Sequence, residues 1–216
     1  MTKLELAQKI DHTLLKPDAT AAQIEALCTE AKKYHFWSVC VNSGRAALAR
    51  QYLAGSAVKL CVVVGFPLGC SVAKVAEAKA MADLGADEID MVMDIGRAKD
   101  GEWDAVEADI RAVRGVCRKQ VLKVILETCL LTREEIVHAC KAAKHAGADY
   151  VKTSTGFSSG GAKAEDVALM KQSAGGLLVK ASGGIHSSLE AMEMLAAGAS
   201  RIGASAGIAI LSGLED

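Results

Sequence analysis

The chain contains 216 residues, with 25 lysines and arginines against 26 aspartates and glutamates, which gives a formal net charge of −1. Charges of both signs are interspersed, so the composition lacks the one-sided charge expected of a protein that binds nucleic acid or an anionic membrane. The length suits one large core, and no stretch has the composition of a linker. We therefore expect a single domain over residues 1–216 that acts on small molecules.

Seven cysteines are spread singly through the sequence and form no CxxC pair. An odd number of scattered thiols is typical of a reduced, cytoplasmic protein. The N-terminus, MTKLELAQKIDHT, is charged every few residues and lacks the apolar centre of a secretory signal. The longest apolar run, residues 60–70, is too short to cross a bilayer, so we expect a soluble protein without a membrane partner.

Apolar strand patterns alternate with helix patterns along the chain. Strands are expected at residues 9–15, 37–41, 59–65, 88–93, 122–127, 149–154, 177–182 and 201–205. Helices are expected at 43–54, 71–84, about 102–117 and 163–173, and a short helix closes the chain. Three further helices are expected to begin at capping boxes, formed by Thr20 with Gln23, Thr132 with Glu135, and Ser187 with Glu190.

An internal repeat supports this assignment. Gly-Ala-Asp or Gly-Ala-Ser recurs at 85–87, 147–149 and 198–200, always between a helix and a strand, where glycine ends a helix in the left-handed conformation. Eight such units predict an α/β fold, a parallel TIM (β/α)8 barrel. The alternative is an open doubly wound sheet, because the chain is short for a barrel. That sheet would need a phosphate loop, and neither GxGxxG nor GxxxxGK[ST] occurs.

Two lysines lie inside apolar strands, in VKTSTGF at 151–157 and VKASGG at 179–184. Lys152 and Lys180 occupy matching positions in neighbouring strand–helix units. Burial disfavours the charged ammonium, so one of a buried pair is expected to act as a neutral, nucleophilic amine. The structural alternative is that both side chains extend along the strand ends to water; it is the weaker explanation for a repeated pair.

In a barrel, the carboxyl ends of all strands meet at one mouth, and catalytic groups come from several of them. The polar residues within the expected strands are therefore predicted to converge: Asp11, Thr13, Cys40, Asp90, Lys123, Glu127, Lys152 and Lys180. Asp90 stands between Ile89 and Met91, a poor place for a carboxylate unless a cation or substrate is near. The alternative for Asp90 is that it only neutralises a lysine.

Two other patterns point away from hydrolysis and metal chemistry. Residues 156–160 match the GxSxG of a nucleophile elbow, but the expected strand ends before them, so the serine is not on a strand-to-helix turn. The five histidines are dispersed and make no HExxH, which disfavours a metal-dependent lyase.

Glycine turns at 182–184 and 203–205 follow the last two strands, where backbone N–H groups can bind phosphate.

At this point the chain resembles a known family. EIDMVMDIG, VKTSTGF and VKASGGI, in this order and preceded by KIDHTLL, are similar to the motifs of the 2-deoxyribose-5-phosphate aldolases, and the likeness covers the whole chain. The resemblance implies a TIM barrel that reversibly cleaves 2-deoxy-D-ribose 5-phosphate to acetaldehyde and D-glyceraldehyde 3-phosphate. It implies neither a metal nor a cofactor.

The resemblance also implies roles for individual residues. Lys152 would form a Schiff base, and Asp90 and Lys180 would move protons. The pocket would be lined by Asp11, Thr13, Cys40 and Lys123, and the phosphate held by Gly156, Gly183, Gly184, Gly203 and Ser205. The last residues, ILSGLED, contain no tyrosine, whereas longer members of the family carry a C-terminal tyrosine that approaches the site; we expect deletion of 214–216 to have little effect.

Two other functions remain open on the residues alone. A phosphosugar isomerase or synthase barrel would use Asp90 or Glu127 as a base without a covalent lysine, and a phosphate-ligand sensor would have no turnover. Neither requires the paired lysines, which favour the aldolase. The sequence allows a homo-oligomer, a dimer or a tetramer, without deciding between them.

Overall fold

The computed structural model describes residues 1–214, so Glu215 and Asp216, on which the expectation about the tail partly depends, lie outside the described residues. Eight parallel strands close into a barrel in the order β1 to β8. Their bounds are β1 Ile10–Leu14, β2 Ser38–Asn42, β3 Lys59–Val64, β4 Glu88–Val92, β5 Val121–Ile125, β6 Tyr150–Lys152, β7 Leu178–Ser182 and β8 Arg201–Ala204. Asp11 of β1 lies opposite Gly203 of β8, which closes the ring. The predicted TIM barrel is confirmed.

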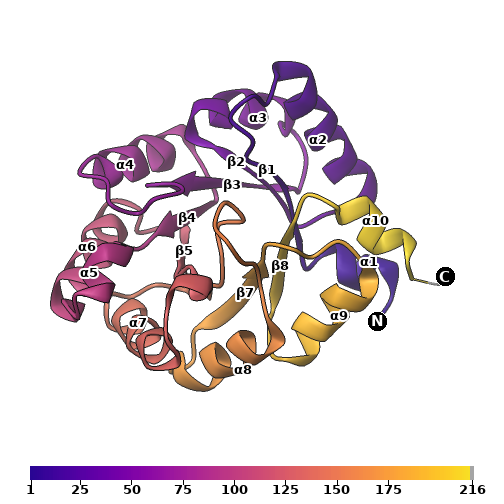
Figure 1. Cartoon of the computed structure of the whole chain (residues 1–216). Helices are drawn as coiled ribbons and strands as arrows, with labels where there is room; N and C mark the ends of the chain where they lie inside the picture. Colours follow the sequence, from indigo (N-terminus) through magenta and orange to yellow (C-terminus); the bar gives the residue numbers. More distant parts are fainter. Residues whose placement is uncertain (215–216) are drawn as a thin grey trace.

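Helices surround the strands (Figure 1). They are α1 Lys3–Ala7, α2 Ala21–Tyr34, α3 Ala46–Tyr52, α4 Lys74–Leu84, α5 Ile95–Lys99, α6 Trp103–Val116, α7 Arg133–His145, α8 Ala164–Ser173, α9 Ser188–Ala196 and α10 Gly207–Ser212, with the 3-10 turns η1 Ser43–Arg45 and η2 Thr128–Leu130. The strands' outward side chains and the helices' inward faces form the apolar core. Among residues 1–214, no helix has both the length and the apolar character needed to cross a bilayer.

Local sequence signals account for most boundaries. The three predicted capping boxes are present, each with reciprocal hydrogen bonds between the first residue and the glutamine or glutamate three positions later. Gly85, Gly147 and Gly198 have φ values of 89°, 83° and 112°, as expected of glycines that end helices. Two short helices were not predicted: α1, which begins at a further capping box of Thr2 with Glu5, and α5, which is capped by Asp94.

The strand that carries Lys152 is shorter than the expected 149–154, because side chains replace its ladder beyond Lys152. Ser182 N donates to Thr153 Oγ1 at 3.0 Å, and Thr155 N donates to the Glu127 carboxylate at 3.1 and 3.3 Å. Threonine hydroxyls commonly compete with strand ladders in this way. The result is an irregular but hydrogen-bonded segment that leads from Lys152 to the barrel mouth.

Candidate active site

The barrel interior holds charged side chains where most TIM barrels hold valine, isoleucine and leucine. Residues two apart on a strand point to the same side, so β4 places both Glu88 and Asp90 inside. All the charged residues named next are buried. They are Asp11 of β1, Glu88 and Asp90 of β4, Lys123 of β5, Lys152 of β6, Lys180 of β7 and Arg201 of β8, and we call them the polar core.

Asp90 lies at the centre of the upper part of the polar core. Its Oδ2 accepts from Lys152 Nζ at 2.9 Å and from Lys180 Nζ at 2.8 Å. Its Oδ1 accepts from Lys123 Nζ at 2.8 Å and from the thiol of Cys61 at 3.1 Å. Lys152 and Lys180 are register partners on β6 and β7. The prediction that the paired lysines and Asp90 converge is therefore confirmed by the geometry.

A second set of ion pairs lies nearer the amino ends of the strands, where Glu88 begins β4 and Arg201 begins β8. Lys180 also contacts Asp11, whose other oxygen accepts from Arg201 Nη1 at 2.9 Å. Arg201 Nη1 lies 3.4 Å from Glu88 Oε2, and Lys123 Nζ lies 2.5 Å from the same oxygen. Every carboxylate of the polar core therefore contacts at least two cationic groups, which offsets the loss of hydration on burial.

The polar core carries one more positive charge than negative when every group is ionised: three carboxylates face three lysines and one arginine. Lys152 makes a single ion pair within the described part of the chain, with Asp90. Lys180 contacts both Asp90 and Asp11. Loss of one proton from Lys152 would leave the polar core neutral and would break the smallest number of these contacts.

The carboxylates of Asp11 and Asp90 and the ammonium of Lys180 are held in their charged forms by their neighbours. Burial raises the pKa of Asp90, but the three ammoniums around it outweigh burial and hold that pKa well below its usual range. Burial likewise raises the pKa of Asp11, and Lys180, Lys123 and Arg201 lower it by more. For Lys180, burial lowers the pKa, and the carboxylates of Asp11 and Asp90 raise it above its usual value.

These directions predict how stability depends on pH. Asp11 and Asp90 have pKa values in the folded chain below their unperturbed value of 3.8. Their contribution to the free energy of unfolding is therefore complete above that pH and is lost as the pH falls below it. Lys123 and Lys180 titrate above 10.5, so theirs is complete below pH 10.5 and is lost above it. Thermal unfolding from pH 3 to 11 should show both losses. A melting temperature that climbs between pH 8 and 10 would contradict the account, because the core ammoniums would then lose protons more easily folded than unfolded.

A cavity of about 390 Å³ opens above the polar core at the carboxyl ends of the strands. Of the predicted residues, its wall includes Thr13, Lys152, Gly156, Gly183, Gly184, Gly203 and Ser205. Asp11, Cys40, Asp90, Lys123 and Lys180 are fully buried beneath it and do not belong to its wall. Lys152 is therefore the predicted catalytic residue that reaches the cavity, and the others surround it from below.

Glycine is required at two of the predicted phosphate-site positions, for different structural reasons. A Cβ on Gly203 would lie 2.9 Å from Lys180 Cε and 3.0 Å from Ser182 Cβ, so glycine there makes room for the lysine. Gly184 has φ 76°, and a Cβ on it would meet nothing within 4 Å. Gly184 is thus required by its backbone conformation rather than by crowding, and its N–H lies in a loop that borders the cavity.

Comparison with known proteins shows which family has this sequence and this barrel. Residues 6–213 match the DeoC/LacD family of aldolases. The chain belongs to this family. It is 56% identical over 213 residues to the deoxyribose-phosphate aldolase of Finegoldia magna, covering 97% of this chain and 100% of that one. It is 54% identical over 217 residues to that of Clostridium perfringens strain SM101, covering 99% and 97%.

A solved structure of a DeoC/LacD relative agrees with the fold. The deoxyribose phosphate aldolase from Aeropyrum pernix, described as tetrameric, superposes with a TM-score of 0.92 at 33% identity, covering 98% of this chain and 91% of that one. The aldolase family and the closed barrel are therefore established for this chain. The predicted resemblance is confirmed.

Sequence reasoning missed several residues of this DeoC/LacD barrel. Glu88 lies two residues before Asp90, and that spacing alone places both inside the barrel. Arg201 begins β8 and packs over the rings of Trp37 and Tyr150, with its guanidinium carbon 4.5 and 5.6 Å from the ring centroids. Lys16 and His186 line the cavity from loops, where neither periodicity nor strand position marks them.

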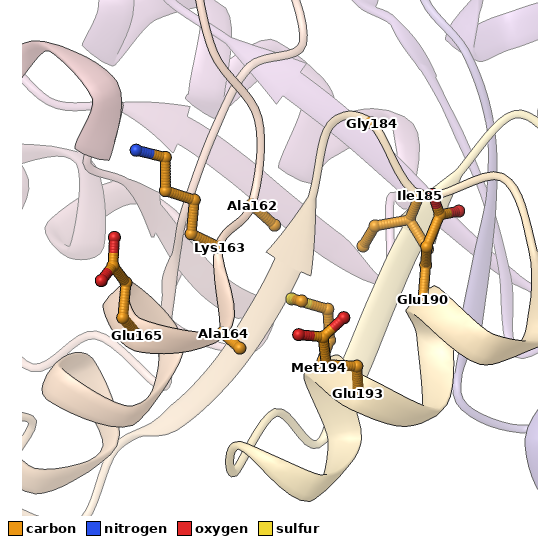
Figure 2. Close-up of a pocket in the computed structure, with 9 residues that line it drawn as sticks. All are labelled: Ala162, Lys163, Ala164, Glu165, Gly184, Ile185, Glu190, Glu193 and Met194. Carbon is orange, nitrogen blue, oxygen red and sulfur yellow. The ribbon is translucent and has the colours of Figure 1, made fainter.

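The aldolase also has a hollow of about 490 Å³ outside the barrel mouth. Figure 2 shows it between Ala162–Glu165 and the first turns of α9, with Gly184 and Ile185 on its border. Glu165, Glu190 and Glu193 line it with one lysine, Lys163. This surplus of carboxylates does not suit a phosphosugar. Lys152 lines the cavity at the barrel mouth, so we assign the active site to that cavity.

Cysteine and carboxylate ligands come close together inside the barrel. Single ligand atoms of Cys40, Cys61 and Asp90 lie within 4.8 Å of one another. However, both oxygens of Asp90 already accept from lysine ammoniums. A divalent cation would have to displace those lysines or bind beside them, so the donor set does not fit a metal.

Proposed function

We propose that this aldolase reversibly cleaves 2-deoxy-D-ribose 5-phosphate to acetaldehyde and D-glyceraldehyde 3-phosphate through a Schiff base on Lys152. The observation that carries the proposal is that Lys152 lines the cavity while its ammonium is 2.9 Å from Asp90 and shares that carboxylate with Lys180. The family relationship supports the same reaction.

The first step needs an unprotonated Lys152. Its proton passes to Asp90 Oδ2, the nearest acceptor, and on to water, while the raised pKa of Lys180 keeps that lysine charged. The free amine adds to the substrate's C1 aldehyde carbon to form a carbinolamine. Protonation of the carbinolamine hydroxyl, with Asp90 returning a proton through water, expels water and leaves a protonated imine.

The protonated imine is the electron sink for carbon–carbon cleavage. When a base removes the C3 hydroxyl proton, the C2–C3 electron pair moves into the imine, and C3 leaves as the aldehyde of glyceraldehyde 3-phosphate. Protonation of the remaining enamine at C2, followed by hydrolysis, releases acetaldehyde and regenerates Lys152. The neighbouring ammoniums hold Asp90 as an anion, so it is already in the form that can accept the C3 hydroxyl proton, through water.

The phosphate group is assigned to the part of the cavity bordered by Gly183, Gly184 and Ser205, together with Gly156, which lies beside Gly183. Lys16 and His186 line the same cavity and add donors there. Hydrogen bonds to a charged group contribute about 1.5–3 kcal/mol each, so two or three of them also serve to orient the distant aldehyde end.

A coupled assay tests the reaction itself. Release of acetaldehyde from 2-deoxyribose 5-phosphate is followed by its reduction with an alcohol dehydrogenase, and glyceraldehyde 3-phosphate is detected separately. We expect equimolar formation of both aldehydes, unchanged by a chelator. No release of acetaldehyde would refute the proposed function. An isomerase that uses Glu127 as its base is disfavoured, because the Glu127 carboxylate is occupied by Thr155.

A test of the phosphate assignment compares the phosphorylated and unphosphorylated sugars. We expect unphosphorylated 2-deoxyribose to react with a kcat/KM at least about a hundredfold lower, given the binding energy of two or three charged hydrogen bonds. Gly184→Asp should remove most of this preference by placing a carboxylate in the anion site. Gly184→Ala is the matched control, because it carries the same backbone strain without the charge. If Gly184→Asp keeps the full preference, the phosphate lies elsewhere. Gly203 is unsuitable for this test, since a side chain there would displace Lys180.

We also infer a cytoplasmic location and an oligomeric assembly. All seven cysteines are free thiols, which supports a reducing compartment. The tetramer described for the Aeropyrum pernix relative supports a dimer or tetramer here. Light scattering of the purified protein would distinguish a monomer from either assembly.

A further inference from the structure

Glu127 has an unusual backbone conformation immediately above the catalytic strands. Its φ and ψ are 60° and 62°, in the left-handed region, and among the described residues only His35 shares a positive φ without being glycine. His35 caps the end of α2, where this conformation is common. Glu127 stands instead at the end of β5. Strain of this kind in a residue with a side chain persists where the surroundings enforce it, often near active sites.

The conformation produces a bulge between β5 and β6. Leu126 N donates to Lys152 O at 2.9 Å, and Thr128 N donates to Thr153 O at 3.0 Å. Just beyond the ends of β5 and β6, the chain therefore advances two residues, from Leu126 to Thr128, while its neighbour advances one, from Lys152 to Thr153. Glu127 is the extra residue. Bulges beside active sites re-aim a side chain. Here the bulge turns the Glu127 side chain toward the segment that follows Lys152.

The Glu127 carboxylate is buried and bonds to that segment. Both of its oxygens accept from Thr155 N, at 3.1 and 3.3 Å, and Oε2 also accepts from the Thr155 hydroxyl. The Thr155 hydroxyl in turn accepts from Phe157 N at 3.0 Å. Within residues 1–214, Glu127 has no ion pair with a lysine, arginine or histidine. The side-chain hydrogen bonds found for it there all go to Thr155.

The residues held in this way form the cavity wall. Lys152, Thr155, Gly156 and Phe157 all line the cavity, whereas Glu127 does not. Gly156 has φ 83° and an open space where a Cβ would stand, so the hydrogen bonds of Thr155, rather than packing, fix the turn around it. The Phe157 ring meets Phe66 edge to face, with centroids 5.2 Å apart, at the rim.

We propose that Glu127 is a positioning residue of the aldolase. Its bulged backbone and buried carboxylate hold the segment from Lys152 to Phe157, and thereby set the amine of Lys152 and the backbone of Gly156 relative to each other. It touches neither the cavity nor the reacting atoms. The inference rests on the proposed function, since Lys152 and Gly156 are taken as the imine and phosphate ends of the same site.

The test compares Glu127→Gly and Glu127→Gln with the wild type. Glycine keeps the left-handed backbone without strain and removes the carboxylate, and glutamine keeps an oxygen for Thr155 N. Because a small misplacement of a reacting group has a large kinetic effect, we expect kcat/KM for 2-deoxyribose 5-phosphate to fall at least about tenfold in Glu127→Gly, through both kcat and KM. Glu127→Gln should recover part of the loss. Activities are compared per folded molecule, determined by circular dichroism at the assay temperature.

His35→Gly is the matched control, because it makes the same backbone change at the other left-handed position, away from the cavity. It should leave kcat/KM within about twofold, as surface changes usually do. Hydrogen exchange of the Thr155 and Phe157 amides should accelerate in Glu127→Gly and stay unchanged in His35→Gly. A merely structural role would lower the melting temperature and leave the kinetics of the folded enzyme and these amides unchanged.

The outcomes separate this inference from the proposed function. A wild-type enzyme that releases no acetaldehyde would refute the function and the inference with it. An active wild type together with a folded Glu127→Gly variant of unchanged kcat and KM would refute the positioning role alone.

Discussion

Lys152→Ala should abolish cleavage of 2-deoxyribose 5-phosphate, lowering kcat by about 10⁴-fold or more, because removal of a covalent nucleophile leaves only binding and electrostatic effects. The fold should survive, since Lys152 makes one ion pair with the residues that the structure describes, and its loss leaves the polar core with equal numbers of positive and negative charges. Lys141→Ala, at an exposed position on α7, is the control and should keep full activity. A folded Lys152→Ala enzyme with measurable turnover near the wild-type value would rule out the covalent mechanism.

Lys180→Met and Asp90→Asn should each lower turnover at least about a hundredfold, as expected for loss of groups that transfer protons or set their affinity. Lys180 is a fixed cation that shares Asp90 Oδ2 with Lys152, so its removal takes away the positive charge beside the reacting amine. Asp90→Asn removes the acceptor that takes that proton. Steady-state kinetics from pH 6 to 9 would measure both effects. Near wild-type turnover over this range in either variant would return that residue to a structural role.

The same two variants should differ in stability. Asp90→Asn leaves three ammoniums around a neutral amide, and breaking a buried ion pair in this way destabilises by roughly 3–5 kcal/mol. Lys180→Met removes one positive charge from a group that has one in excess, so its effect should be smaller. Because domains are stable by about 5–15 kcal/mol, both variants should remain folded at 25 °C. Chemical denaturation would reveal the order, and a less stable Lys180→Met would contradict the charge count.

The sequence was sufficient to predict the barrel because each unit carries its own signals. Capping boxes such as Thr132 with Glu135 begin helices, and glycines such as Gly147 end them, independently of the rest of the fold. Barrel closure then follows from counting eight units. The helix α5 was missed because its five residues are too few for a periodic pattern, although Asp94 caps it.

The catalytic residues were predictable for a different reason. Charged residues inside apolar strands, such as Lys152, Lys180 and Asp90, conflict with local burial, and such conflicts often mark function. Arg201 and Glu88 stand at strand ends, where charge is ordinary, so their burial depends on the closed barrel. The conformation of Glu127 could not be predicted, since it results from hydrogen bonds with Thr155, 28 residues away in sequence.

Trapping of the imine tests the central claim most directly. The enzyme is incubated with acetaldehyde or 2-deoxyribose 5-phosphate, reduced with borohydride, and analysed by intact mass and by peptide mass mapping. The account predicts loss of activity and one reduced adduct per chain, an N-ethyl group from acetaldehyde, on the peptide that contains Lys152. An adduct that maps to Lys180 or elsewhere, or a turning-over enzyme that traps nothing, would contradict it.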